Sequence, residues 1–213
     1  MSIKLISITK PVIEGINTAE ELISYCARVS NPSNQLNTDT APKLLKYLIQ
    51  HKHWSPMEQV SMTLEIKTSR AIAAQILRHR SFSFQEFSQR YSQSTSFEPI
   101  EWRMQGNTNR QVGDEEVDLS PELKYEVDTT LASCEELYNK LIGKGLAKEC
   151  ARMVLPLTTS TTIYMTGNIR SWTHYIDLRA NQDTQKEHRI IAEEIKKIYI
   201  KEFPSLSDAL NWT

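Results

Sequence analysis

The chain has 213 residues, of which 39% are hydrophobic and 24% are charged, and its formal net charge is −1. This composition is typical of a globular protein and excludes a disordered or fibrous chain. The small net charge argues against a surface that is basic throughout, as in many nucleic-acid-binding and membrane-surface proteins, so any anion site must be local.

No stretch of the sequence reaches the roughly 20 apolar residues of a membrane span, and the first residues lack the pattern of a secretory signal. The three cysteines, Cys26, Cys134 and Cys150, are widely spaced. Their odd number and spacing predict reduced thiols rather than a disulfide framework or a zinc site. We therefore expect one domain over residues 1–213, located in the cytoplasm and without a membrane partner.

The first third of the chain predicts a mixture of strands and helices. Residues 4–9 alternate polar and apolar side chains, as a half-buried strand does. Thr18 and Glu21 have the spacing of a capping box, which predicts a helix up to about Arg28. The other elements predicted here are a helix over residues 41–50, a strand over residues 60–66 and a helix over residues 69–79.

The second half of the chain begins with a polar, acidic region over residues 97–118, which shows no period and predicts a long loop. Ser120 as N-cap and Pro121 in the first turn predict a helix up to about Lys140. The remaining predicted elements are a helix over residues 146–154, a β-branched strand over residues 157–166, a helix that ends near Arg179, and a last helix over residues 184–203.

The segment from Arg78 to Arg90 holds three arginines, a histidine and three serines within thirteen residues. A guanidinium binds phosphate through two parallel hydrogen bonds, and serine hydroxyls fill the remaining oxygen lone pairs. The sequence lacks a glycine-rich phosphate loop, because its one G-x-G, at residues 143–145, follows a predicted helix and lacks the third glycine. Phosphate groups would therefore be bound by side chains of this segment.

A structural interpretation competes for part of this segment. Arg78, His79 and Arg80 fall at a predicted helix C-terminus, where the helix dipole favours cations. That interpretation does not account for Arg90, which lies beyond the helix, and Glu86 supplies a single acidic partner for the cluster.

The spacing R-H-R-x-x-S-x-x-x-x-S-x-R, complete from Arg78 to Arg90, resembles the signature of flavin-dependent thymidylate synthases. The resemblance continues at residues 53–56 (HWSP), at residues 151–156 (ARMVLP), at Asn168 and at residues 178–179. It implies an α+β fold with a central, mostly antiparallel, twisted sheet flanked by helices. It also implies the reductive methylation of dUMP to dTMP, with 5,10-methylenetetrahydrofolate as carbon donor and NADPH as the reductant of FAD.

Position by position, the resemblance implies two overlapping sets of contacts. The FAD contacts are Ser55, Arg78, His79, Arg80, Glu86, Asn168 and His174. The dUMP contacts are Gln75, Arg78, Ser88, Arg90, Arg152 and Arg179. In the family these residues come from different subunits of a homotetramer, so that each active site lies at a subunit interface.

Arg179 is the predicted catalytic residue, because a fixed cation stabilises the negative charge that develops on the pyrimidine ring. Reduced FAD supplies the hydride, so this route needs no enzyme nucleophile. The competing route uses a cysteine that adds to the pyrimidine, and Cys150 is its candidate. Ser88, which stands beside cations and lacks an orienting His–Asp pair, is interpreted as a phosphate ligand rather than a nucleophile.

Helical geometry gives a separate view of the predicted helix after Asn168. At about 100° per residue, Asn168, Trp172, Tyr175 and Arg179 share one stripe, and His174 points about 120° away from it. Core packing is the preferred interpretation of Trp172 and Tyr175. For His174, a partly buried structural histidine and a flavin contact both remain open.

Three further interpretations of the sequence compete with a flavin enzyme. His51 and His53 with Glu58 lack the H-E-x-x-H spacing and a third ligand, so we expect no metal site. A single-strand nucleic-acid binder would interleave the cations with stacking aromatics, here Phe82, Phe84 and Phe87, but the net charge and the absence of further basic stripes disfavour a nucleic-acid partner. A helical scaffold with a structural ion-pair cluster is the third.

Overall fold

The computed structural model of the protein describes residues 1–93, 95–107 and 109–212. Four strands form its central sheet in the order β1-β2-β6-β3, and every neighbouring pair is antiparallel. The strands are β1 (Ser2–Ile8), β2 (Ser61–Ser69), β3 (Ser83–Glu86) and β6 (Ser160–Asn168). β2 and β6 pair along their whole lengths, from Ser61 opposite Asn168 to Ser69 opposite Ser160. The predicted antiparallel sheet with flanking helices is confirmed.

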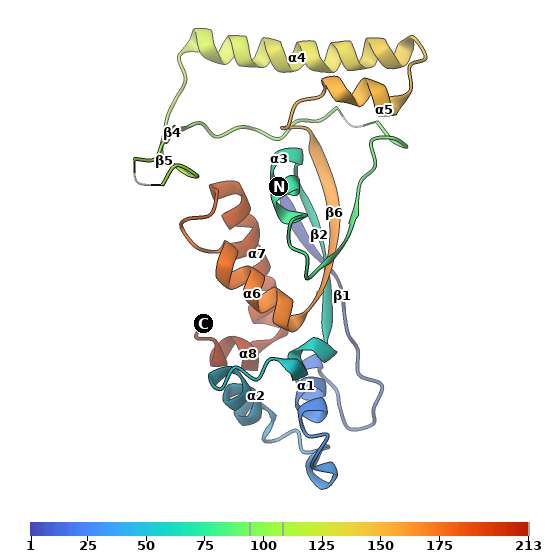
Figure 1. Ribbon diagram of the computed structural model, residues 1–213, viewed down its shortest axis with the longest axis vertical. Coiled ribbons are helices and arrows are strands. Elements are labelled where there is room, and N and C mark those ends of the chain that lie inside the picture. The colour runs from blue at the N-terminus through green and yellow to red at the C-terminus, as the bar shows by residue number, and fades with distance from the viewer. Residues whose placement is uncertain (94, 108, 213) are drawn as a thin grey trace.

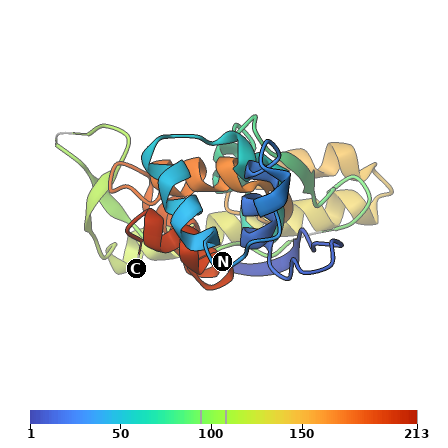
Figure 2. The same cartoon turned by 90° about the horizontal axis from the view of Figure 1, so that it is seen from below.

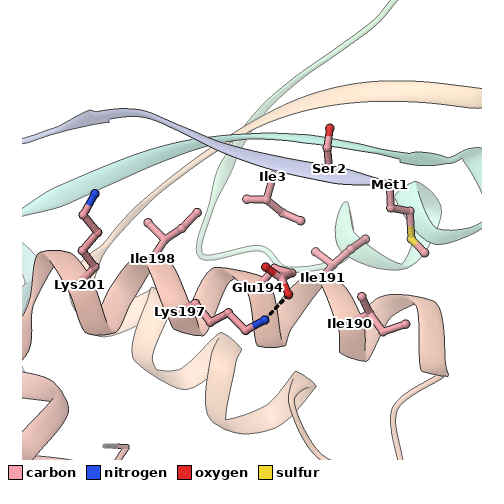
Figure 3. A pocket seen from close by; sticks show the side chains of 9 residues that line it. All are labelled: Met1, Ser2, Ile3, Ile190, Ile191, Glu194, Lys197, Ile198 and Lys201. Atoms are coloured by element: carbon pink, nitrogen blue, oxygen red, sulfur yellow. Dashed lines mark hydrogen bonds and ion pairs between the residues drawn. The ribbon is translucent and has the colours of Figure 1, made fainter.

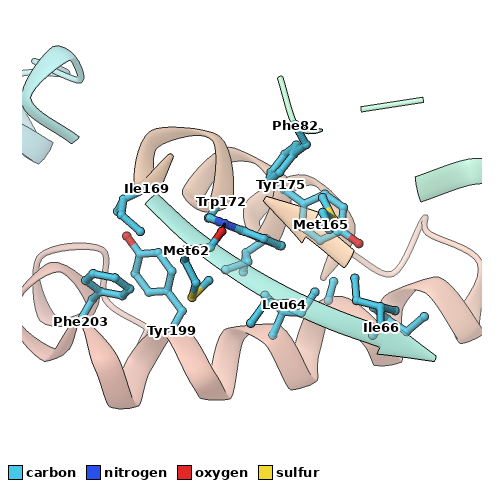
Figure 4. Close-up of a cluster of buried hydrophobic side chains, with 14 of the residues drawn as sticks. Met62, Leu64, Ile66, Phe82, Met165, Ile169, Trp172, Tyr175, Tyr199 and Phe203 are labelled. Carbon is cyan, nitrogen blue, oxygen red and sulfur yellow. Dashed lines mark hydrogen bonds between the residues drawn. The ribbon is translucent and has the colours of Figure 1, made fainter. Parts of the chain in front are cut away.

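The two faces of the sheet differ in polarity. Met62, Leu64 and Ile66 of β2 are fully buried and face helices α6 (Ile169–Arg179) and α7 (Lys186–Glu202) (Figures 1 and 4). The opposite face carries polar side chains that hydrogen-bond across the strands, such as the Tyr164 hydroxyl, which donates to Glu65 over 2.8 Å. One face therefore forms the core and the other remains open and polar, as strand alternation requires.

Aromatic side chains fill the core at the start of α6. Trp172 is fully buried, and its indole N–H donates to the carbonyl oxygen of Met62 over 3.0 Å. The ring of Phe82, just before β3, lies edge-on to Trp172 with centroids 4.7 Å apart. A Cβ atom on Gly167 would lie 2.4 Å from Phe82 Cδ1, so only glycine allows this ring to approach β6 so closely. Core packing of Trp172 and Tyr175 is confirmed.

The remaining helices gather at the two ends of the molecule (Figure 1). At one end lie α1 (Ala19–Ala27), α2 (Ala41–Gln50) and α8 (Pro204–Ala209), which Figure 2 shows from below. At the other end lie α4 (Pro121–Gly143) and α5 (Lys148–Ala151). The predicted capping box of Thr18 and Glu21 begins α1, and Ser120 caps α4 as predicted. The described residues also include three short 3₁₀ turns: η1 (Pro32–Asn34), η2 (Ser55–Gln59) and η3 (Arg152–Val154).

Some elements differ from the sequence-based expectation. The region 97–118, predicted as a loop, contains the two-stranded antiparallel sheet of β4 (Arg103–Gln105) and β5 (Gly113–Glu116). Strands of three and four residues are too short to show a period in the sequence. The same reason explains why β3 and α8 were not predicted. Helix α3 (Arg70–Ile76) ends three residues earlier than expected, at Ile76.

A pocket of about 400 Å³ lies between β1 and α7, away from every predicted site residue (Figure 3). Isoleucines from both elements, among them Ile3, Ile191 and Ile198, point toward one another there, and the charged side chains of Lys197 and Lys201 stand at the edge. None of the helices in the described ranges combines the length and the apolar character needed to cross a membrane.

Candidate active site

The signature segment and the end of α6 meet in a direct hydrogen bond. Arg179 donates from Nε to Nε2 of His79 over 2.9 Å, which joins residues 100 positions apart in the chain. His79 follows the end of α3, and its ring lies edge-on to that of Tyr175 with centroids 4.8 Å apart. The predicted catalytic arginine is thus anchored on the predicted flavin-binding histidine.

His79 is held neutral by its surroundings. Burial, and then the positive charge of Arg179, lower the pKa of His79 to about 4. Because Nε2 accepts a hydrogen bond from Arg179, the proton of the neutral ring resides on Nδ1. At neutral pH the positive charge of this hydrogen-bonded pair therefore resides on Arg179, and His79 offers an N–H donor.

A chain of hydrogen-bonded side chains lies behind this pair. The hydroxyl of Tyr175 lies 3.0 Å from Nε2 of His188, whose Nδ1 lies 3.2 Å from Oε1 of Gln75. Gln75 in turn donates from Nε2 to Oε1 of Gln185 over 2.6 Å. His188 is fully buried, and burial followed by the charges of Arg179 and His79 lowers its pKa to about 3. Gln75, predicted as a dUMP contact, is therefore fixed by two partners.

Sequence reasoning missed His188 and Gln185. His188 precedes Ile191 and Ile195 by three and seven residues, so it occupies the buried stripe of α7. A histidine at an apolar position of a helix was the available signal. Gln185 lies just before the first turn of α7 and carries no signal of its own in the sequence.

Arg78 and Arg80 flank His79, and both side chains are exposed. In the ranges that the structure describes, neither guanidinium pairs with a carboxylate. Two cations without counter-ions, separated by one neutral imidazole, leave a local positive potential beside Arg179. This arrangement suits a ligand with more than one phosphate.

A second group of predicted dUMP contacts lies beyond the far end of β3. Ser88 lines a pocket of about 500 Å³ on the open face of the sheet, together with side chains of β2 and β6. Arg90 is exposed, with its guanidinium 5.9 Å from the centre of the Tyr91 ring. Lys148 of α5 donates to the carbonyl oxygen of Tyr91 over 2.8 Å, and Arg152 begins η3, which directly follows α5.

Within one chain, the six predicted dUMP contacts therefore fall into two groups. Gln75, Arg78 and Arg179 belong to the His79 end of β3, and the other three, Ser88, Arg90 and Arg152, belong to the opposite end. The six residues from Ser83 to Ser88 span roughly 16 Å from the first Cα atom to the last in extended conformation. The two groups of one chain therefore lie at opposite ends of this span.

The remaining predicted flavin contacts have structural partners. Asn168 is the N-cap of α6 and accepts a hydrogen bond from the N–H of Ser171 over 2.8 Å. His174 is exposed, and its ring lies 4.7 Å from that of Trp54, the neighbour of Ser55 in the chain. Ser55 and His174 are therefore brought to the same side of α6, through Trp54.

Glu86 lies at the end of β3 and lines the pocket that Ser88 also lines. Its Oε1 accepts hydrogen bonds from Arg70 over 2.9 Å and from the hydroxyl of Thr161 over 3.0 Å. Glu86 therefore neutralises Arg70 rather than the arginines of the signature, which leaves the charge of the signature available to a ligand.

The structure gives evidence on three alternatives raised by the sequence: a nucleic-acid binder, a cysteine nucleophile and a metal site. Phe82 is buried and Phe84 packs against the core, so neither ring forms an exposed stacking surface for bases. Cys150 is an exposed free thiol in α5. Among the described residues, no three His, Cys, Asp or Glu side chains are grouped as metal ligands; His51 instead stacks on Tyr47 with ring centroids 4.0 Å apart.

Comparisons with known proteins agree on one group of enzymes. The family described as "Thymidylate synthase complementing protein" matches residues 11–205. A probable flavin-dependent thymidylate synthase of Paramecium bursaria Chlorella virus 1 is 58% identical over 218 aligned positions, and a flavin-dependent thymidylate synthase of Synechocystis sp. is 51% identical over 218; both matches cover 100% of each chain. In fold, the protein resembles the UMP/dUMP methylase PolB of Streptomyces cacaoi, crystallised with 5-Br dUMP, with a TM-score of 0.81, 24% identity and coverage of 99% of this chain and 94% of that one.

Proposed function

This chain belongs to the family of flavin-dependent thymidylate synthases, and from this premise we propose its reaction in full: dUMP is methylated to dTMP with FAD as the flavin, 5,10-methylenetetrahydrofolate as carbon donor and NADPH as reductant. The enzyme is a flavin-dependent methyltransferase of dTMP synthesis. The folate, the nicotinamide cofactor and the identity of the flavin are the proposed parts.

The contact between Arg179 and His79 carries the proposal for the site. It anchors one guanidinium beside a half-buried neutral imidazole, with the remaining guanidinium nitrogens available to a ligand. A cation that is held in place before the reaction stabilises developing negative charge without having to reorganise. Arg179 is the proposed catalytic residue, because deprotonation of the uracil ring nitrogen creates such a charge.

The donor set at the signature fits FAD. Arg78 and Arg80 supply two exposed guanidiniums for a diphosphate, and His79 supplies an Nδ1–H for a carbonyl or phosphate oxygen. Ser55, Asn168 and His174 supply further polar groups near the start of α6, and Glu86 lies at the end of β3. When bound and reduced, FAD supplies the hydride for the reaction.

The two groups of dUMP contacts support a shared active site in a homotetramer. Gln75, Arg78 and Arg179 of one chain would face Ser88, Arg90 and Arg152 of another, since one chain holds the two groups at opposite ends of β3. Helix α4 has exposed apolar side chains, including Leu123, Tyr125 and Leu137, and such side chains favour association. We place the enzyme in the cytoplasm, where its free cysteines stay reduced.

The proposal is tested with the purified protein. It should show the visible absorption of an oxidised flavin, and acid release should yield FAD rather than a mononucleotide. NADPH oxidation coupled to dTMP formation should require both dUMP and 5,10-methylenetetrahydrofolate. Formation of dTMP in the absence of the folate would contradict the proposed carbon donor.

A further inference from the structure

We propose that Glu187 and His188 are positioning residues that hold the side-chain amide of Gln75 in one orientation and thereby make the site select a uracil over a cytosine nucleotide. The inference rests on the proposed role of Gln75 as a dUMP contact. It concerns α7, in which no site residue was predicted.

The orientation starts at Glu187, in the first turn of α7. Arg103 of β4 donates to Oε1 of Glu187 over 2.5 Å, and Gln185 donates to Oε2 over 2.9 Å. Burial acts to raise the pKa of Glu187, but the hydrogen bonds from Arg103 and Gln185 hold that pKa below its usual value. Glu187 is therefore ionised at neutral pH, and a carboxylate only accepts hydrogen bonds.

The carboxylate determines the orientation of both glutamines. Only the Nε2 of Gln185 can face Glu187, so Oε1 of Gln185 faces the other way, toward Gln75. That oxygen lies 2.6 Å from the Gln75 amide, so the atom of Gln75 that meets it must be the donor Nε2. Oε1 of Gln75 is consequently turned toward His188.

The same logic determines the tautomer of His188. Nδ1 of His188 lies 3.2 Å from Oε1 of Gln75 and must carry the proton, because that oxygen only accepts. In the neutral ring Nε2 is then an acceptor, and the hydroxyl of Tyr175, 3.0 Å away, donates to it. Each side chain in this series therefore donates to the next, in the order Tyr175, His188, Gln75, Gln185 and Glu187.

An amide held in one orientation can distinguish uracil from cytosine, whereas an amide that rotates freely cannot. Uracil and cytosine differ at ring positions 3 and 4, where donor and acceptor are exchanged. A glutamine that can rotate by half a turn satisfies either pattern, whereas one held at both atoms presents the same donor and acceptor at all times. A buried polar site of this kind penalises the wrong partner strongly, because its groups remain unpaired.

The sharpest test replaces the carboxylate that sets the direction. Glu187→Gln keeps the shape of the side chain but introduces an amide that donates as well as accepts. The amides of Gln185 and Gln75 can then adopt either orientation. Glu101→Gln is the matched control. Glu101 also accepts a hydrogen bond from Arg103, over 2.7 Å, but it is not part of the series of hydrogen bonds from Tyr175 to Glu187. The measurement is the ratio of the dissociation constants of dCMP and dUMP for the flavin-loaded enzyme.

We expect wild type and Glu101→Gln to share one high ratio, and Glu187→Gln to lower it by roughly tenfold or more. A purely structural role would weaken both nucleotides alike and leave the ratio unchanged. An unchanged ratio in Glu187→Gln would overturn the inference while dTMP formation by the wild type still supported the proposed function. Wild-type enzyme that does not bind dUMP would overturn both.

Two substitutions at His188 test the other end of the chain. The amide of His188→Asn places an N–H close to the position of Nδ1, so this variant should retain the wild-type ratio. His188→Leu removes the donor and should lower the ratio. If Asn and Leu lower it equally, His188 does not orient Gln75 and the inference fails.

Discussion

At the scale of single residues, the site depends on one histidine that stays neutral and one arginine that stays charged. His79 and Arg179 share a hydrogen bond, so the proton that a free imidazole would take up below neutrality is excluded by burial and by the guanidinium. Of these two side chains, only Arg179, the residue proposed to stabilise the pyrimidine anion, is therefore charged.

Substitution of Arg179 tests the catalytic role against the cysteine route. Arg179→Ala should reduce kcat for dTMP formation by about 100- to 1,000-fold, the usual effect of removing a group that stabilises developing charge. Cys150→Ala should retain activity, since the thiol is exposed in α5 and has no role in the flavin route. The opposite pattern, an inactive Cys150→Ala and an active Arg179→Ala, would contradict the catalytic role proposed for Arg179.

Half-buried His79 and fully buried His188 predict how stability depends on pH. Their folded pKa values, about 4 for His79 and about 3 for His188, lie below the ordinary value of 6.5. As pH falls below 6.5, the unfolded chain takes up these protons before the folded protein does, so the contribution to stability is full above pH 6.5 and declines toward pH 4 and below.

We therefore expect the free energy of unfolding, measured with urea, to be lower at pH 5 than at pH 7. The double variant His79→Asn, His188→Asn has no imidazole at either position and should lose less stability over the same interval. An equal loss in the variant would show that other groups cause the pH dependence.

At the scale of elements, Phe82 connects the signature to the sheet. Its ring is enclosed by Trp172, Tyr175 and the backbone of Gly167, and it immediately precedes β3. The close approach to β6 determines where β3 begins and so where the two ends of the signature lie. The packing of one ring thus positions cations that are themselves exposed.

Gly167→Ala should disturb this packing. The new Cβ would lie 2.4 Å from two atoms of a ring that is enclosed on its other sides, so we expect a loss of about 1–3 kcal/mol in the free energy of unfolding. Gly143→Ala, in α4, is the control, because its Cβ meets nothing within 4 Å and alanine favours a helix. Thermal unfolding of the two variants compares them, and equal stability would contradict the packing argument.

At the scale of the whole molecule, one chain carries two half-sets of predicted nucleotide contacts at opposite ends of β3. The polar face of the sheet, with its pocket of about 500 Å³, is left open by helices that lie on the other face. The proposed site between copies would bring the two half-sets together without any change in the fold of one chain.

Mixing two inactive variants tests the shared site. Arg90→Ala damages one half-set and Arg179→Ala damages the other, so in the proposed homotetramer each variant by itself should be inactive. Subunits exchanged between the two should form some interfaces with both half-sets intact, and dTMP formation should return. No recovery, with mixed tetramers confirmed by native mass spectrometry, would show that each chain builds its own site.

The sequence by itself determined the family, the residues of the signature and the long elements. Nine or more residues of regular alternation in β2 or of helical spacing in α7 are local patterns, and a phosphate-binding cluster without a glycine-rich loop is visible in the order of residues alone. The short elements β3, β4, β5 and α8 remained hidden, because three to six residues complete too few periods to be distinguished from a loop.

Only the tertiary structure decided which of these residues meet. Arg179 and His79 are 100 positions apart, and packing of α6 against Phe82 and the sheet brings them within hydrogen-bonding distance. It also buries His188 behind Gln75 and separates Arg90 from Arg78 along β3. The reason is physical: residue order specifies local backbone preference and side-chain chemistry, whereas the directions of hydrogen bonds and the neutrality of buried imidazoles arise only when distant groups exclude water together.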